Sequence, residues 1–109
     1  IKSLKEDFLK NVKIPGSDNE FNLEIEKAGR VLDFIDLGIL MSQDAYHREE
    51  SCGGHFREEY QTEENEAKRN DNDFCYVAAW EFNGQDQSPK LNKEELKFEN
   101  VELSSRSYK

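Results

Sequence analysis

The spacing of apolar residues along the first part of the chain predicts a short amphipathic helix. Leu4, Phe8 and Val12 recur at intervals of four residues, which places them on one helical face. We expect this helix to end near Lys13, because the Pro15-Gly16 pair that follows cannot continue it. Proline has no amide proton to donate, and it disfavours a helical conformation in the residue before it.

A longer apolar pattern follows and predicts the dominant helix of the chain. Ser17 and Glu20 have the spacing of a capping box, so we expect the helix to begin there. Two adjacent apolar rows then continue as far as about Glu50, and together they make a wide apolar face that indicates packing against more than one neighbour. The rows contain Phe21, Ile25, Ala28, Leu32, Ile35 and Ile39, and Val31, Phe34, Met41 and Ala45 with Gly38 in register.

The last part of the chain has the pattern of a β-hairpin. A polar stretch over residues 58–73 precedes it and predicts a solvated loop or a short exposed helix. Residues 74–82 are β-prone, and Asn83-Gly84 is a strong turn signal. Residues 91–101 could supply the return strand, best at residues 95–99, which alternate with period two, and a connection of about ten residues would join the strands.

These elements predict a mainly α fold in a single domain. An antiparallel helical bundle occupies residues 1–51, a polar loop 52–73, a hairpin 74–101 and an extended tail 102–109. Two helices do not cover the wide face of the long one, so a missing helix, a partner subunit or self-association has to cover it. Because the chain starts at Ile1 without a capping residue or a signal peptide, we expect it to be cut from a longer protein.

The composition makes some classes of function unfavourable. Asp and Glu number 24 against 15 Lys and Arg, which gives a formal net charge of −9. A surface this acidic repels phosphate backbones, so we expect no nucleic-acid partner. No window approaches the roughly 20 consecutive apolar residues that span a bilayer. Cys52 and Cys75 are too few for a disulfide framework, which favours two reduced thiols in a cytoplasmic protein.

The cluster of residues 47–59 is the densest group of chemically versatile side chains, and it allows three interpretations. His47, Cys52 and His55 could bind a metal, with Cys75 or a carboxylate as fourth ligand, although the paired short spacings of zinc sites are missing. Cys52 could be a nucleophile activated by His55, but the C-terminal end of a helix disfavours a thiolate. The third interpretation is structural, with a glycine turn and side chains that bond to carbonyls or carboxylates, and we favour it.

The same cluster resembles a segment of the flavoprotein subunit of succinate dehydrogenase and fumarate reductase, which carries R-x-E-S-R-G-x-H-x-R-x-D-[YF] at the end of a long helix. The matching residues are Arg48-Glu49-Glu50-Ser51-Cys52-Gly53-Gly54-His55-Phe56-Arg57-Glu58-Glu59-Tyr60. Residues 17–40, the stretch around Ala79-Trp80 and the ending Arg106-Ser107-Tyr108-Lys109 are also similar to that family. Cys52 replaces the usual Arg and Glu59 the usual Asp. L-aspartate oxidase shares a related segment and remains an alternative.

The resemblance implies a C-terminal domain made of a three-helix bundle, truncated here at its N-terminus, and a hairpin. It implies that FAD lies in a separate flavin domain, that the iron–sulfur subunit is a partner, and that the parent lies on the cytoplasmic face of the inner membrane. We expect no catalytic, cofactor-binding or metal-binding residue in this chain, which has no GxGxxG loop. Docking or bracing contacts are expected from Arg48, Glu50, Ser51, Cys52, Gly53, Gly54, His55, Arg57, Glu58, Arg106 and Tyr108.

A second hypothesis comes from a different class of protein. The chain could be a free-standing acidic module whose exposed helix face binds a partner helix or a second copy of itself.

Overall fold

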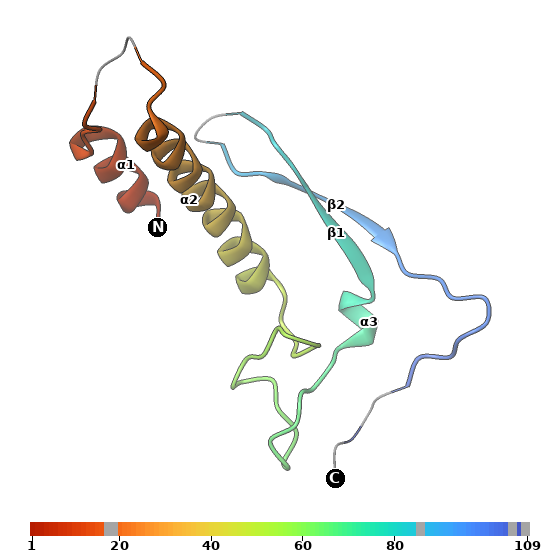
Figure 1. The fold of residues 1–109 in the computed structure, drawn as a ribbon. Helices are drawn as coiled ribbons and strands as arrows, with labels where there is room; N and C mark the ends of the chain where they lie inside the picture. The colour runs from red at the N-terminus through yellow and green to blue at the C-terminus, as the bar shows by residue number, and fades with distance from the viewer. Residues whose placement is uncertain (17–19, 85–86, 105–106, 108–109) are drawn as a thin grey trace. The chain divides into compact units, whose positions relative to one another are not determined.

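A computed structural model describes residues 1–16, 20–84, 87–104 and 107. The chain divides into two compact units, residues Ile1–Asp44 and Ala45–Lys109, and each is described by itself. Figure 1 shows the elements in chain order. Helices dominate, and a two-stranded antiparallel hairpin follows them, as the sequence predicts.

The first unit is an antiparallel pair of helices. Helix α1, Lys2–Asn11, lies beside the long helix α2, Leu23–His47, whose last turn belongs to the second unit (Figure 1). Lys5 Nζ pairs with Asp36 Oδ1 at 2.5 Å. The Ile1 side chain lies next to Gly38, since a Cβ built at Gly38 would be 4.0 Å from Ile1 Cδ1. Ile35 is the buried apolar residue of α2, with 8% of its surface exposed.

The long helix begins later than the capping-box pattern predicts. Glu20 and Phe21 are not helical, and α2 starts at Leu23. Ser17 lies outside the described residues. Asn22 takes over the start of the helix, because its Oδ1 accepts a hydrogen bond from the Glu24 amide at 3.0 Å while its Nδ2 donates to the Pro15 carbonyl at 2.9 Å. An Asn before the first turn is among the best helix caps. The helix therefore begins after Asn22 and not after Ser17, where the capping-box pattern predicted its start.

The far end of α2 is also shorter than predicted, since the helix ends at His47 rather than near Glu50. The reason is tertiary, because the side chains of Arg48 and Glu50 form the polar contacts described below. Helix α1 ends at Asn11, which is within two residues of the expected boundary.

The second unit contains the hairpin. Strand β1, Tyr76–Glu81, lies within the predicted segment and pairs antiparallel with β2, Lys90–Glu95. The return strand lies at the start of the predicted stretch 91–101, whereas the segment favoured within that stretch, residues 95–99, overlaps β2 only at Glu95. Trp80 pairs with Leu91, the only apolar residue of β2. This cross-strand apolar pair fixes the register of the hairpin, and the alternating pattern of residues 95–99 does not.

The polar stretch before the hairpin is a loop with a short helix at its end. Gln61 and Ala67 form an isolated antiparallel bridge, and Asn65 has a φ of 63° at the tip between them. Helix α3, Asp71–Phe74, then leads into β1 (Figure 1). Within the described ranges, no helix combines the length and the apolar character that crossing a membrane requires.

Candidate functional site

The segment that resembles the family motif, residues 48–60, is called here the motif segment. It begins where α2 ends and reverses direction through a tight turn. Cys52 N donates to His55 O at 2.8 Å, and His55 N donates to Cys52 O at 3.0 Å. Gly53, between them, has a φ of +58°. A Cβ at Gly53 or Gly54 would meet no heavy atom within 4 Å, so backbone conformation at Gly53, not space, requires glycine.

Ser51 is the most buried side chain of the motif segment, with none of its surface exposed. Its Oγ accepts a hydrogen bond from Arg57 N at 2.9 Å and donates to Arg57 O at 3.2 Å. Its own amide donates to the Lys68 carbonyl at 2.9 Å. One serine therefore ties together the residues that follow α2, the segment after the turn and the polar stretch.

The last carbonyls of α2 are satisfied by side chains of the motif segment. The carbonyl of Arg48 accepts from His55 Nε2 at 3.0 Å and from Arg57 Nη1 at 3.3 Å, and the same Arg57 Nη1 reaches Tyr46 O at 3.1 Å. Because a carbonyl only accepts, His55 carries its proton on Nε2 in this contact. Helix ends leave such carbonyls without intrahelical partners, and a cation there also complements the helix dipole.

Arg57 is held from three directions. Its guanidinium lies 5.0 Å from the ring centroid of Tyr60 and forms an ion pair with Glu59, besides capping α2. The hydrogen bond with Glu59 raises the pKa of Arg57. The pKa of Glu59 is lowered, first by a hydrogen bond from its own backbone amide and then by Arg57. Both groups are thus charged at neutral pH, and the guanidinium is fixed in orientation.

A second group of polar contacts forms around the Arg48 guanidinium, just after the end of α2. Arg48 Nη1 bonds to Glu50 Oε1 at 2.6 Å, and the guanidinium also donates to the carbonyls of Phe74 and Tyr76, each at 3.3 Å. Glu50 is 2% exposed, and its other oxygen accepts from the Asn70 amide at 2.9 Å. A buried carboxylate with a cation and an amide as partners has its charge compensated.

An aromatic cluster joins the last turn of α2 to the face of the hairpin that carries Tyr76 and Trp80. His47 Nε2 lies 3.0 Å from Tyr76 Oη, and the imidazole meets the Trp80 ring edge to face at 5.6 Å. Two cations lie over the Tyr76 ring, Arg48 at 5.5 Å and Lys93 at 4.2 Å from its centroid. Tyr76 is 7% exposed and is, with Ile35, one of the buried apolar residues among those described.

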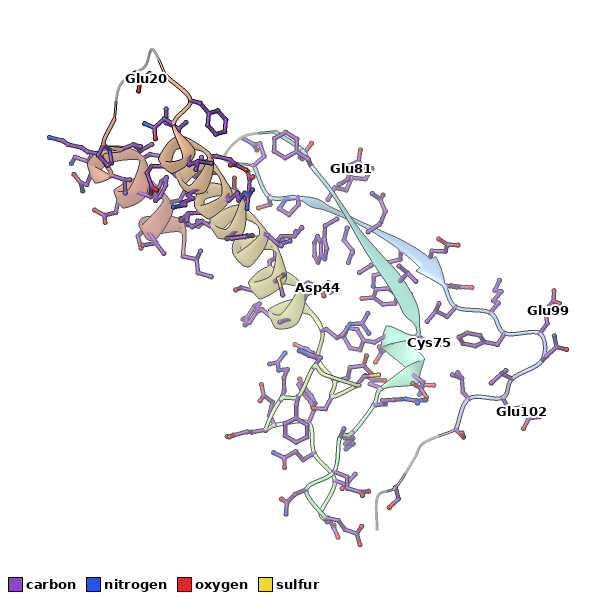
Figure 2. All side chains as sticks on the ribbon, viewed as in Figure 1. Glu20, Asp44, Cys75, Glu81, Glu99 and Glu102 are labelled. Carbon is purple, nitrogen blue, oxygen red and sulfur yellow. The ribbon has the colours of Figure 1, made fainter. Side chains whose placement is uncertain are left out.

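The geometry favours the structural interpretation of the cluster over the two chemical ones. His47 bonds to Tyr76, and His55 Nε2 donates to a backbone carbonyl rather than to Cys52. Cys52 is exposed, and Cys75 is partly buried where α3 meets β1 (Figure 2). Over the described part of the chain, no three His, Cys, Asp or Glu side chains converge as a metal-binding group would. Neither a metal site nor an activated thiol has support here.

The structure brings most of the predicted residues together. Arg48, Glu50, Ser51, His55 and Arg57 form one connected polar network. Cys52 and the two glycines make the turn, and Glu58 is exposed, with its carbonyl accepting from Gln61 Nε2. Arg106 and Tyr108 lie outside the described residues.

Sequence reasoning missed the polar stretch as a source of partners. The Lys68 carbonyl and the Asn70 amide complete the bonds of Ser51 and Glu50, although this stretch was expected only to be solvated. Arg69 pairs with Asp71 and donates to the Ser104 carbonyl, so it also holds the tail. The polar motif itself was the available signal for these contacts. Its polar groups need hydrogen-bond partners once they are buried, and a neighbouring polar stretch can supply them.

The fold and this network define a mainly helical domain with a terminal hairpin, closed by a buried polar motif at the end of its long helix. The chain belongs to the fumarate reductase flavoprotein C-terminal family, whose model matches residues 1–108. Searches among curated proteins and among solved structures gave no significant match.

Proposed function

We propose that this chain is the C-terminal docking and bracing domain of a succinate dehydrogenase or fumarate reductase flavoprotein subunit. Membership of the family supports the class of parent protein. In that parent, succinate and fumarate would be interconverted at FAD in a separate flavin domain. Electrons would pass to the iron–sulfur subunit and a membrane quinone at the cytoplasmic face of the inner membrane. The chain itself would carry out no catalysis.

The observation that carries this proposal is the large apolar surface left exposed. Phe34 is 68% exposed, Met41 63% and Leu37 54%, all on α2. Spacings of three, four and seven residues place these three on one face of the helix. An exposed apolar stripe of this kind marks a surface that another protein surface covers.

The motif segment would serve as the brace. Its bonds run from the end of α2 to the polar stretch and the start of β1, so it fixes the local geometry of the second unit. Arg57 would brace the segment internally, because its guanidinium bonds to Glu59 and to the carbonyls of Tyr46 and Arg48. We extend this docking role to Cys52, Glu58, Arg106 and Tyr108, and name the flavin domain and the iron–sulfur subunit as the partners.

FAD supplies the redox chemistry of the parent, and the residues of this chain do not fit as its holder. The sequence contains no glycine loop of the kind that brings a backbone close to a pyrophosphate. The network of the motif segment is closed on itself, with each guanidinium and imidazole directed at the chain's own carbonyls or carboxylates.

A first experiment tests the absence of chemistry in the chain alone. The purified 109-residue chain is measured for flavin absorbance and for oxidation of succinate with an artificial electron acceptor. We expect neither signal. A bound flavin or turnover of succinate would contradict the assignment of catalysis to a separate domain.

A second experiment distinguishes the proposal from its alternatives. Sequencing the reading frame upstream of Ile1 is expected to show a flavin domain. Its absence would favour the free-standing acidic module. If the complete protein oxidised L-aspartate rather than succinate, the parent would be an L-aspartate oxidase-like enzyme.

The docking face is tested in the complete subunit. Phe34→Ser and Met41→Ser are expected to weaken retention of the flavin domain after limited proteolysis between the domains, because they remove apolar contact area. Asp33→Asn, at an exposed position on the same helix, is the matched control and should leave retention unchanged. Equal behaviour of all three variants would show that this stripe is not the docking face.

A further inference from the structure

The Asn83-Gly84 pair is a strong turn signal in the sequence, and in the structure it lies in the long connection between the two strands. A two-residue turn of the type that favours Asn-Gly needs positive φ at both residues. Gly84 has a φ of +110°, whereas Asn83 is not among the described non-glycine residues with positive φ. The strand ladder ends at the Glu81–Lys90 pair, so Asn83 lies in the connection between the strands. Figure 2 labels Glu81 at the end of β1.

We propose that Asn83 is a site of intramolecular modification, at which the Gly84 amide nitrogen attacks the Asn83 side-chain amide to form a succinimide. The new bond joins Gly84 N to Asn83 Cγ, and the side-chain nitrogen leaves as ammonia. Water then opens the ring at one of its two carbonyls. The product is aspartate, or isoaspartate in which the main chain runs through the former side chain. No electrons are transferred, and water is the only co-reactant.

Three observations favour this reaction at Asn83. Asn83 is exposed and lies outside the strand ladder, so no ladder hydrogen bond holds its backbone. Gly84 has no side chain to shield its nitrogen, and it already adopts a conformation that residues with a Cβ rarely reach. Among the described residues, a Cβ built there would meet Gln87 Cγ at 3.5 Å, which is an ordinary van der Waals contact and no clash.

Three asparagines whose side chains form hydrogen bonds, Asn11, Asn22 and Asn92, lack this combination of exposure and a following glycine. Asn11 lies in α1, where its Nδ2 donates to Asp7, and Asn92 lies in β2, where its Nδ2 donates to Glu81. Asn22 uses both side-chain atoms to hold the start of α2. Each is followed by a residue with a bulky side chain, and Asn83 alone in the sequence precedes glycine.

The modification changes the connection between β1 and β2 in two ways. Either product adds one negative charge two residues from Glu81, which bonds to Lys90 and Asn92 at the end of the ladder. The isoaspartate product also lengthens the main chain by one carbon atom. Both changes act on the end of the hairpin opposite Tyr76.

The test is peptide mapping by mass spectrometry of the intact folded chain, incubated at mildly alkaline pH in ¹⁸O-labelled water. We expect Asn83 to gain mass first, with one ¹⁸O incorporated and with aspartate and isoaspartate both present. Its rate should lie within about twofold of the rate in a free peptide of the same sequence, because the connection leaves the pair unprotected. Asn92 is the internal control and should react at least about tenfold more slowly in the fold.

Two variants separate the chemistry from the surroundings. Asn83→Gln should abolish the reaction, because the longer side chain would need a less favourable six-membered ring. Gly84→Ala should slow it by about tenfold through the added Cβ, provided that circular dichroism shows an unchanged hairpin. Reaction in the peptide but not in the folded chain would overturn the proposal, as would exposed Asn65 or Asn100 reacting as fast as Asn83.

Discussion

Ser51 and Arg57 exchange two hydrogen bonds, with Arg57 N donating to Ser51 Oγ at 2.9 Å and Ser51 Oγ donating to Arg57 O at 3.2 Å. A side chain thereby makes the pair of contacts that a neighbouring strand would make. Because Ser51 is fully buried, water cannot replace either bond, and the return of the chain after the Cys52–His55 turn depends on this hydroxyl.

Ser51→Ala is therefore expected to destabilise the second unit by about 1–3 kcal/mol, since it removes the partner of the part-buried amide and carbonyl of Arg57. Urea unfolding followed by the fluorescence of Trp80, the chain's single tryptophan, measures this. Ser88→Ala, at an exposed position, is the control. Equal midpoints for the two variants would show that Ser51 is not structurally required.

The ion pair between Arg48 and Glu50 gives a second expectation. Glu50→Ala should cost about 3 kcal/mol, because it leaves Arg48, which is 21% exposed, without its carboxylate and removes the acceptor of the Asn70 amide. In a double-mutant cycle with Arg48→Met, the double variant should lose less than the sum of the single ones.

The control for that cycle is the exposed pair of Lys97 and Glu95, whose side chains are 83% and 78% exposed. Lys97→Met should leave the free energy of unfolding unchanged, since exposed pairs contribute little. Strict additivity in the Arg48–Glu50 cycle would show that the two side chains do not interact energetically.

The two adjacent glycines of the turn should respond differently to the same substitution. Gly53→Ala is expected to cost about 1–2 kcal/mol, because its φ of +58° strains a residue with a Cβ. Gly54→Ala should be neutral or slightly stabilising, since its Cβ would meet nothing within 4 Å. The midpoints of thermal unfolding decide between them, and an unchanged midpoint for Gly53→Ala would contradict the conformational argument.

The pair of Arg69 and Asp71 predicts a pH effect. A hydrogen bond from Arg69 lowers the pKa of Asp71, although desolvation opposes the shift. The stabilisation is therefore present above the ordinary aspartate range and is lost as the pH falls through the lowered pKa of the folded state. Carboxyl NMR titration measures it. In Arg69→Gln the pKa of Asp71 should rise towards its ordinary value, and an unchanged titration would exclude Arg69 as the cause.

The accuracy of the sequence-based predictions followed the range of the interactions involved. The apolar spacing of α2 predicted a long helix correctly. Apolar residues at helical intervals form one face whichever surface that face packs against. The start was wrong, since Asn22 offers a capping bond of the same kind as Ser17 and only the structure decides between them. The return strand was placed too far along within its predicted stretch, because one contact, Trp80 with Leu91, fixes the register.

For the candidate site, the sequence indicated which side chains matter but not their partners. The carbonyls of Phe74 and Tyr76 lie 26 and 28 residues from Arg48, and that of Lys68 lies 17 residues from Ser51. Backbone groups are the same in every residue, so no side-chain pattern marks the ones that the part-buried Arg48 or the buried Ser51 will use.

Neighbouring residues Phe34 and Ile35 of α2 provide the last prediction, because they lie on different faces of the helix. Ile35, 8% exposed, packs inside the first unit, so Ile35→Ala should remove about 2–3 kcal/mol and melt much of α1 and α2. Phe34, 68% exposed, should tolerate Phe34→Ala with unchanged helicity by circular dichroism. If the chain self-associates, Phe34→Ala should instead raise the dissociation constant measured by sedimentation. Loss of helicity in Phe34→Ala at concentrations where the chain is monomeric would show that the stripe packs within the chain, and it could then not be the surface that a partner covers.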